Sequence, residues 1–269
     1  MALFRSILCA IDLSDLTNRV IYHAAGLVGA TGARFTILHV ADDRAKAARE
    51  MDAQRAFIEA VPYGATYLAD TVVQIDSGDP VEVITRVADE RAADLIVCGA
   101  RGRTGIARML LGSTTAGLLQ RADRPVFLVG PTDWDVVTLG LDRVGLNFGA
   151  LIVAIDLADV KNPQLHIGSE LAALSNQKLL VMTVARDSRE DHDVAQDLRA
   201  RARGLEPAPP HAVIVRRGEV AQEIARCAVA EGAGLVIMGV RRGGRRSPGQ
   251  IALEVLETRR AHVLAVPGD

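Results

Sequence analysis

The stretch SILCAIDLSD at residues 6–15 decides the fold, because it returns later in the chain as LIVAIDLAD at residues 151–159. Aligning the two copies sets Asp12 opposite Asp156, 144 positions apart. In both copies an apolar run ends on an aspartate, which is typical of a buried strand followed by a polar loop. The match predicts that the chain contains an internal repeat.

Two further segments extend the repeat. GDPVEVITRVADERAADLIVCGA at 78–100 matches GEVAQEIARCAVAEGAGLVIMGV at 218–240, now 140 positions apart. VFLV at 126–129 matches VLAV at 263–266, 137 positions apart. The shrinking offset indicates that the second copy has lost four residues in its middle and three near its end.

Each copy alternates apolar runs with segments of helical length. In the first copy we expect strands near 4–12, 34–41, 70–76, 94–99 and 126–129. Consecutive Val, Ile and Leu residues are expected when helices cover both faces of a parallel sheet. The alternation predicts right-handed βαβ units and an α/β fold. We therefore expect two tandem open parallel-sheet domains, Rossmann-like, each with strand order 3-2-1-4-5.

Two helix starts can be placed from the residue types. Asp79 supplies a capping acceptor, Pro80 suits the first helical position, and Glu82 falls in the first turn. Ser14 is predicted to cap the helix after the first strand in the same way.

The repeat also sets the domain limits. We expect a first domain at 1–130, a linker at 131–148 and a second domain at 149–269, since the linker segment has no counterpart in the repeat. Trp134 is the single tryptophan, and we expect it to pin the linker onto one domain; the alternative is a ligand contact.

Composition excludes several classes of protein. The chain has 269 residues, with 31 Lys and Arg against 33 Asp and Glu, so its formal net charge is −2. This balance argues against a protein that coats nucleic acid or an anionic membrane. Aromatic residues make up 3%, which also disfavours base stacking on single strands.

Three separated cysteines, Cys9, Cys98 and Cys227, suit a reducing compartment better than a disulfide framework. No apolar run approaches the roughly 18 residues that a bilayer span needs, and the start lacks the features of a signal peptide. We therefore expect a cytoplasmic protein without a membrane anchor.

The strongest local signal is the glycine-rich segment DLIVCGARGRTGIARMLLGSTTAGLL at 94–119. Gly99 and Gly102 allow backbone N–H groups to approach an anion, and Gly112 precedes a helix whose N-terminus favours negative charge. Ser113, Thr114 and Thr115 add hydroxyl donors. Arg101 and Arg103 add positive charge. The alternative interpretation is a surface loop that ends in an ordinary helix cap.

Topology favours a binding site over that alternative. In doubly wound sheets, ligands bind outside the carboxyl ends of strands where the strand order reverses, which here lies between the first and fourth strands. Asp12 ends the first strand and Gly99 ends the fourth. Asp12 could accept hydrogen bonds from an adenine or a ribose while the loop takes phosphates, although it also suits a turn-capping role.

Together these features resemble a tandem protein of the universal stress protein family. The spacing Gly-x2-Gly-x9-Gly-(Ser/Thr) of its ATP-binding branch is met by Gly99, Gly102, Gly112 and Ser113. The resemblance covers both repeats and implies an adenine nucleotide alpha-hydrolase-like fold that binds ATP, or AMP or ADP, with Mg²⁺. It implies nucleotide contacts from Ala10, Asp12, Val40, Cys98, Gly99, Gly102, Gly112, Ser113, Thr114 and Thr115. We expect Cys98 to be a small buried strand residue and not a reactive thiol.

The second copy departs from this pattern. Arg242 stands where the second glycine belongs, and Gly249 is followed by Gln250, which has no hydroxyl. Three residues are missing between Gly239 and Gly249 relative to the first copy. We therefore expect no equivalent phosphate loop. We interpret the arginine-rich run at 241–246 as a solvated loop, with a separate anion site or a nucleic-acid patch as the alternatives.

Enzyme motifs are absent from the sequence. It contains no P-loop, no Gly-x-Ser-x-Gly elbow and no His-Glu-x-x-His zinc motif, and no catalytic pair or metal site can be named from spacing. His39 and His262 fall inside expected strands, which favours satisfied core residues over ligands.

Three hypotheses follow. The first is a non-enzymatic nucleotide-binding stress or signalling protein with ATP in the first domain. The second is a slow ATPase or adenylate-transferring enzyme, and the third is a scaffold with a vestigial site. The last strands, VFLV and VLAV, are expected to pair with equivalent edges, either within one chain or in a homodimer.

Overall fold

The computed structural model divides the chain into two compact units, one of Met1–Pro131 with Val137–Leu146 and one of Thr132–Val136 with Asn147–Asp269. The structure describes residues 3–43, 45–49, 51–52, 70–100, 111–131, 135–139, 144–240, 248–258 and 260–268.

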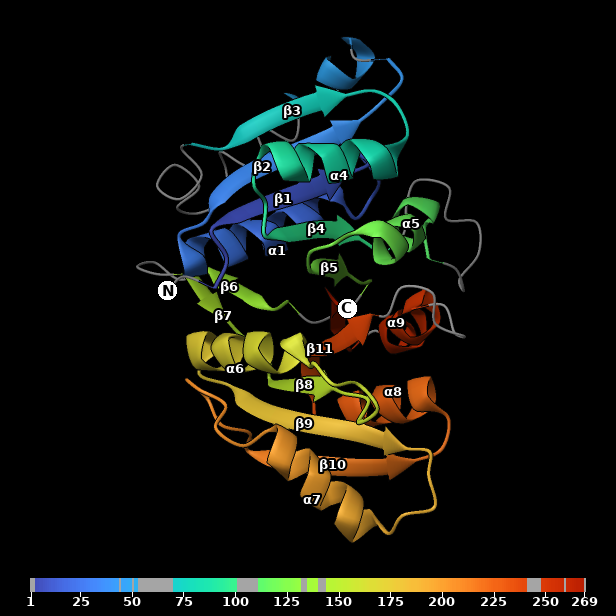
Figure 1. Ribbon diagram of the computed structural model, residues 1–269. Coiled ribbons are helices and arrows are strands. Elements are labelled where there is room, and N and C mark those ends of the chain that lie inside the picture. The colour runs from blue at the N-terminus through green and yellow to red at the C-terminus, as the bar shows by residue number, and fades with distance from the viewer. Residues whose placement is uncertain are drawn as a thin grey trace. The chain divides into compact units, whose positions relative to one another are not determined.

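The first unit is built on a parallel sheet whose strands pair in the order β3-β2-β1-β4-β5 (Figure 1). This confirms the order 3-2-1-4-5 expected from the sequence. All six residues of the central strand β1 are buried, so the core lies on both of its faces. The strands are β1 (Ser6–Ile11), β2 (Arg34–Val40), β3 (Val72–Asp76), β4 (Leu95–Gly99) and β5 (Val126–Val129).

Among the described residues, the helices that cover this sheet include α1 (Thr17–Thr31), α4 (Pro80–Glu90) and α5 (Ser113–Arg121). Right-handed crossovers put α1 on one face and α4 and α5 on the other, because the chain moves outward from β1 to β2 and then back past β1 to β4 (Figure 1). The crossovers leave the carboxyl ends of the strands at one edge, where the loops gather.

The two predicted helix starts had different outcomes. Asp79 caps α4 as expected, and its carboxylate accepts the N–H groups of Val81 and Glu82 at 3.0 Å each. The prediction for Ser14 is wrong: the N-cap of α1 is Leu16, with no side-chain cap bond. Ser14 contributes its carbonyl oxygen, which accepts the N–H of Thr17 at 2.9 Å.

Part of the expected linker forms an antiparallel strand pair, β6 (Val137–Leu139) and β7 (Val144–Leu146). Both strands pack on α1, where Gly26 and Gly29 make room for them: a Cβ at Gly26 would lie 2.2 Å from a Val137 methyl group. Glycine in this helix therefore serves close packing. Trp134 lies outside the described residues.

The second unit repeats the architecture, with strands in the order β10-β9-β8-β11-β12. Its strands are β8 (Ala150–Ala154), β9 (Lys178–Ala185), β10 (Ala212–Arg217), β11 (Ala233–Val240) and β12 (His262–Pro267). Its helices are α6 (Pro163–Ser175), α7 (Asp191–Arg201), α8 (Val220–Ala230) and α9 (Pro248–Glu257).

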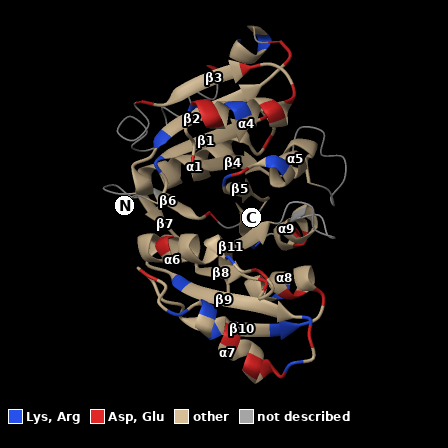
Figure 2. Ribbon diagram, viewed as in Figure 1, with Lys and Arg blue, Asp and Glu red and all other residues tan. Residues whose placement is uncertain are grey.

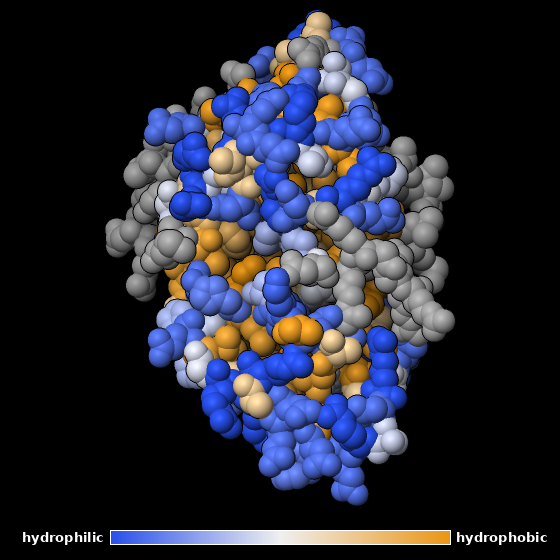
Figure 3. Space-filling model, viewed as in Figure 1, coloured by the Kyte–Doolittle hydropathy of each residue, from blue (hydrophilic) through white to orange (hydrophobic). Residues whose placement is uncertain are grey.

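Charges of both signs are mixed on the helices, as Figure 2 shows for α4 and α7. On α4, Arg86 pairs with Glu90 at 2.5 Å, and on α7 Asp197 pairs with Arg189. Hydrophilic residues also cover these two helices on the face drawn in Figure 3. None of the helices in the described part of the chain combines the length and apolar character that a bilayer span requires.

Candidate functional site

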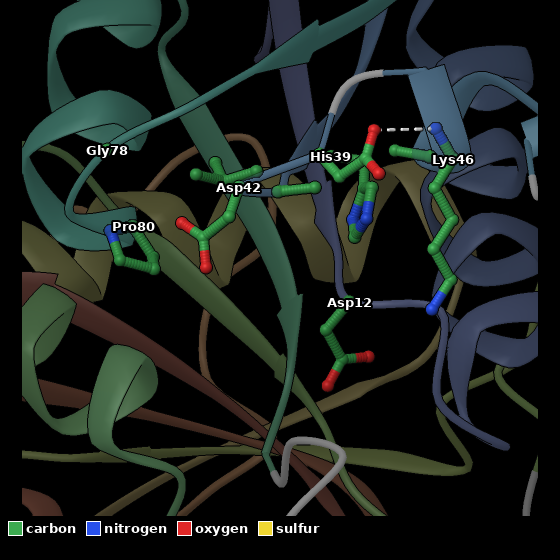
Figure 4. Close-up of a pocket in the computed structure, with 10 residues that line it drawn as sticks. Asp12, His39, Asp42, Lys46, Gly78 and Pro80 are labelled. Atoms are coloured by element: carbon green, nitrogen blue, oxygen red, sulfur yellow. Dashed lines mark hydrogen bonds between the residues drawn. The ribbon is translucent and has the colours of Figure 1, made fainter.

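A pocket of about 420 Å³ opens at the carboxyl ends of β1 and β2 in the first unit (Figure 4). It lies at the same carboxyl-end edge of the sheet as the predicted switch point between β1 and β4, but on the β2 side of β1, and no residue of β4 lines it. A volume of this size is typical of small-molecule sites. The lining residues are Asp12, His39, Val40, Ala41, Asp42, Asp43, Lys46, Ala47, Gly78 and Pro80.

Asp12 lies directly after β1, beside Leu13, whose φ of 58° turns the chain away from the sheet. Its Oδ1 accepts the N–H of Ser14 at 3.1 Å, so the expected turn contact is present. Its Oδ2 is buried and has no hydrogen-bond partner, and the same holds for the hydroxyls of Ser14 and Thr17. Since buried polar atoms in folded proteins are normally hydrogen-bonded, these atoms are candidates for ligand contacts.

His39 is buried in β2 and lines the same pocket. Its Nδ1 lies 2.9 Å from the carbonyl oxygen of Ile11. Because a carbonyl oxygen accepts and never donates, Nδ1 must carry the proton in this contact, and Nε2 of the neutral ring is an acceptor. His39 is a strand residue with a satisfied nitrogen, as expected, but it is also part of the site, which the sequence interpretation missed.

The rim of the pocket comes from the loop after β2 and the turn before α4. Asp42 and Asp43 follow β2, and Asp43 Oδ1 accepts the backbone N–H of Lys46 at 2.9 Å. Gly78 has a φ of 126°, which favours glycine, and brings the turn against the pocket. None of these residues was predicted from the sequence. The available signal was their position, since polar residues that directly follow neighbouring parallel strands meet at one edge.

The glycine-rich loop is described at its two ends. Gly99 ends β4, and the N–H of Gly112 donates to the carbonyl oxygen of Ala100 at 3.1 Å, which brings the two ends of the loop together. The Thr115 hydroxyl donates to the carbonyl oxygen of Gly99 at 2.8 Å and ties α5 to β4. Arg101, Gly102 and Arg103 lie outside the described residues.

The remaining predicted residues surround this edge. Ala10 is buried in β1, Val40 ends β2 and lines the pocket, and Ser113 and Thr114 open α5, with Ser113 exposed. Among the described residues, no three His, Cys, Asp or Glu side chains gather as a metal site.

Cys98 is buried in β4, as expected, next to Ala10 of β1 in the sheet register. Burial raises the pKa of its thiol to about 12; the Thr115 hydroxyl opposes this shift and the Asp12 charge adds to it. Burial also raises the pKa of Cys9 far above its usual range. Both side chains are therefore neutral thiols at physiological pH and contribute packing.

At the end of β11, the strand that corresponds to β4, the second unit packs one of its own side chains. Gln164 of α6 is 2% exposed, and its amide lies against Gly239, where a Cβ would be 3.0 Å from the amide nitrogen. Its Nε2 also lies 3.4 Å from Asn162 Oδ1. Gly239 occupies the position of Gly99 in the repeat, yet here the glycine makes room for a side chain.

Arg201 of α7, an exposed residue, contacts the loop that follows β8. Its guanidinium donates to the carbonyl oxygen of Leu157, at 3.0 Å, and to that of Asp159. Both carbonyls belong to the loop that follows β8, which is the counterpart of the loop after Asp12. The second unit therefore holds this loop with an internal cation.

Comparisons with known proteins agree with this architecture. Residues 3–130 match the model of the universal stress protein family. A universal stress protein from Methanocaldococcus jannaschii is 35% identical over 52 residues, which are 19% of this chain and 32% of that protein. A Staphylococcus haemolyticus protein named as a universal stress protein is 29% identical over 142 residues, 48% of this chain and 86% of its own length.

The fold extends over both units. The crystal structure of a universal stress protein from Archaeoglobus fulgidus aligns at a TM-score of 0.70 and 19% identity, covering 98% of this chain and 96% of that chain. A Pseudomonas aeruginosa structure aligns at 0.68 and 19%, covering 98% and 93%. Residues 3–130, whose strand order and glycine spacing carry the resemblance, form a domain that matches the universal stress protein family.

Proposed function

We propose that this chain is a stress-response protein that binds one adenine nucleotide, ATP with Mg²⁺, in its first unit and acts by binding, without turning the nucleotide over. The observation that carries the proposal is the buried, unpartnered Oδ2 of Asp12 at the edge of a pocket of about 420 Å³. A buried carboxylate oxygen without a partner in the protein is suited to accept a hydrogen bond from a ligand.

The two parts of the site suit the two ends of a nucleotide. The pocket beside Asp12 presents carboxylates and an imidazole, which suit the hydroxyl and amino donors of a nucleoside. The glycine-rich loop between Gly99 and Gly112 suits phosphates, because glycine lets amides approach an anion and α5 begins there. Phosphate oxygens would supply ligands for Mg²⁺.

The second unit is proposed to be a structural partner. Gln164 packs against Gly239, the counterpart of Gly99, Arg201 binds the loop after β8, and the second copy lacks the glycine spacing. The proposed stoichiometry is therefore one nucleotide per chain.

Equilibrium dialysis with ATP and Mg²⁺ tests the proposal and should give about one saturable site per chain. Gly102→Val adds two methyl groups inside the proposed phosphate loop and should abolish binding, whereas Gly243→Val, in the shortened loop of the second copy, is the matched control and should retain it. Circular dichroism checks that both variants fold. Absence of saturable binding contradicts the proposal, and steady formation of ADP or AMP that is lost in Gly102→Val would favour an enzyme instead.

A further inference from the structure

The loop that follows β9 in the second unit, residues 186–190, consists entirely of exposed residues. The first residues of α7, which begins directly after the loop at Asp191, are exposed as well. Because exposed residues bury little apolar surface, the hydrophobic effect contributes little to the position of this loop. Its conformation therefore depends on polar contacts.

Arg217, at the end of β10, makes the central contact. Its guanidinium donates to the carbonyl oxygen of Asp187, at 2.7 Å, and to that of Arg189. Its Nε donates to the carboxylate of Asp191 at 2.7 Å. Figure 2 shows the carboxyl end of β10 in blue, next to a loop that carries both colours. One side chain thus binds the loop at two backbone points together with the start of α7, which suits the rigid planar fork of arginine.

Arg189 connects the loop to α7 a second time. Its Nε donates to the carboxylate of Asp187 at 2.7 Å, and its guanidinium also donates to the carboxylate of Asp197. The hydrogen bond from Arg189 is the main reason why the pKa of the Asp187 carboxyl is lowered from its usual value, so Asp187 is charged at neutral pH. Asp187 Oδ1 in turn accepts the backbone N–H of Arg189 at 3.3 Å.

Every ion pair of this network is open to solvent. The side chains of Asp187, Arg189, Asp191, Asp197 and Arg217 are between 40% and 67% exposed. Exposed ion pairs are weak and are screened by salt, because the Debye length falls from about 10 Å at 0.1 M to about 3 Å at 1 M ionic strength. The restraints on the loop therefore weaken as salt is added, and the loop has no buried side chain to replace them.

A neighbouring segment of the chain is held differently. Before β10, the Ser169 hydroxyl donates to the carbonyl oxygen of Ala208 at 2.8 Å and accepts the N–H of Ala208 at 3.0 Å. Ser169 is 0% exposed. Since both groups are neutral and the hydroxyl is buried, salt screening does not weaken this contact.

We propose that residues 186–190 form an ionic latch, closed at low ionic strength and opened, together with the first turn of α7, as ionic strength rises. Opening frees the carbonyl groups that Arg217 binds and separates the paired side chains. The second unit would then present a different charged surface to its surroundings at high and at low salt. This inference concerns the second unit alone and does not depend on nucleotide binding.

Hydrogen exchange of the full chain, compared at about 0.1 M and about 1 M NaCl, tests the latch. The Arg189 amide and the amides of the first turn of α7 should exchange at least about threefold faster at the higher concentration, because the open form is more populated. The Ala208 amide should keep its rate. Sucrose at matched osmolality should change neither, which separates an ionic effect from an osmotic one.

A variant pair isolates the network. Arg189→Gln should raise exchange in the loop several-fold at low salt and remove most of the salt response. Arg199→Gln is the matched control, because Arg199 is also exposed on α7 and its side chain forms no ion pair within the described part of the chain. Arg217→Lys keeps the charge and should still raise exchange, since an ammonium does not reproduce the fork that reaches two carbonyls and a carboxylate.

Several outcomes would overturn the inference. Equal exchange of the loop at the two salt concentrations would show that the loop is not held by screened charges. An equal acceleration of the loop and of Ala208 would show a general loss of stability in place of a local opening. A salt response that persists unchanged in Arg189→Gln, with the fold verified by circular dichroism, would exclude this network as the latch.

Discussion

The two units form the same local turn at the carboxyl ends of their first strands, but the surroundings of the turn differ. Asp12 and Asp156 each accept a backbone N–H two residues later, at 3.1 and 2.9 Å. In the first unit Asp12 Oδ2 then lacks a partner beside a pocket. In the second unit Gln164 packs against Gly239, and Arg201 binds the carbonyls of the neighbouring loop.

This difference shows that a shared strand-end aspartate does not by itself define a binding site. The side chains that surround this strand end come from elsewhere in the fold. In the second unit they come from α6 and α7. The same glycine of the repeat bounds a proposed phosphate loop in one unit and accommodates a glutamine amide in the other.

The largest expected effect separates the two aspartates. Asp12→Asn should weaken ATP binding about tenfold to a hundredfold, because a charge-assisted hydrogen bond in a buried site is replaced by a neutral one. Asp156→Asn should leave ATP affinity unchanged, since the proposed site lies in the first unit. Calorimetric titration measures the ATP affinity of both variants. An equal loss of ATP affinity in the two would contradict the assignment of the site to the first unit.

The next effect concerns Gln164, which packs against Gly239 in the second unit. Gln164→Ala removes a buried amide and leaves a void against Gly239, so the free energy of unfolding should fall by about 1–3 kcal/mol. Chemical denaturation measures this change. Gln196→Ala, on the exposed side of α7, is the matched control and should change stability little. If Gln164→Ala created a second nucleotide site, the interpretation of the second unit as structural would be wrong.

A further effect, confined to high pH, should come from the two buried thiols of the first unit, Cys9 and Cys98. Folded Cys98 has a pKa of about 12, and burial also raises that of Cys9 above its usual range. Unfolded thiols lose their protons near pH 8.5 while the folded ones keep theirs, so stability is constant below that pH and falls as the pH rises further. The slope for each thiol is about 1.4 kcal/mol per pH unit between the two pKa values.

Scanning calorimetry at pH 8 and pH 10 measures this loss. The variant Cys9→Ala/Cys98→Ala should show a smaller decrease in stability between the two pH values than the parent chain. Cys227→Ala changes a thiol of the second unit, whose pKa burial also raises, and gives the comparison between units. An unchanged pH dependence in the double variant would show that other groups govern alkaline unfolding.

Much of the first unit could be predicted from residue order. The strand expected at 4–12 is observed at Ser6–Ile11, and the helix start at Asp79 and Pro80 is capped as expected. These features are local, because apolar runs and capping residues act over a few neighbouring positions.

The two features that the sequence interpretation missed, at Ser14 and His39, also have a physical reason. Ser14 has the right residue type for a helix cap, but the positive φ of Leu13 redirects the chain and the helix begins after Leu16. His39 looked like a core residue because it lies in a strand, yet its ring reaches the pocket. Both outcomes depend on backbone direction and on packing between strands, which spacing along the chain does not encode.

The sequence by itself determined the repeat, the strand order and the positions of Asp12 and the glycines of the first copy, because these follow from periodicity and residue type. The tertiary structure decided which side chains surround the carboxyl ends of the strands in each unit. Only when β1, β2 and the turn before α4 converge does a pocket form beside Asp12, and only the folded second unit places Gln164 against Gly239. In both units, parallel strand pairing brings together side chains that lie far apart in sequence. The contacts among these side chains determine whether a carboxylate faces a ligand or its own chain.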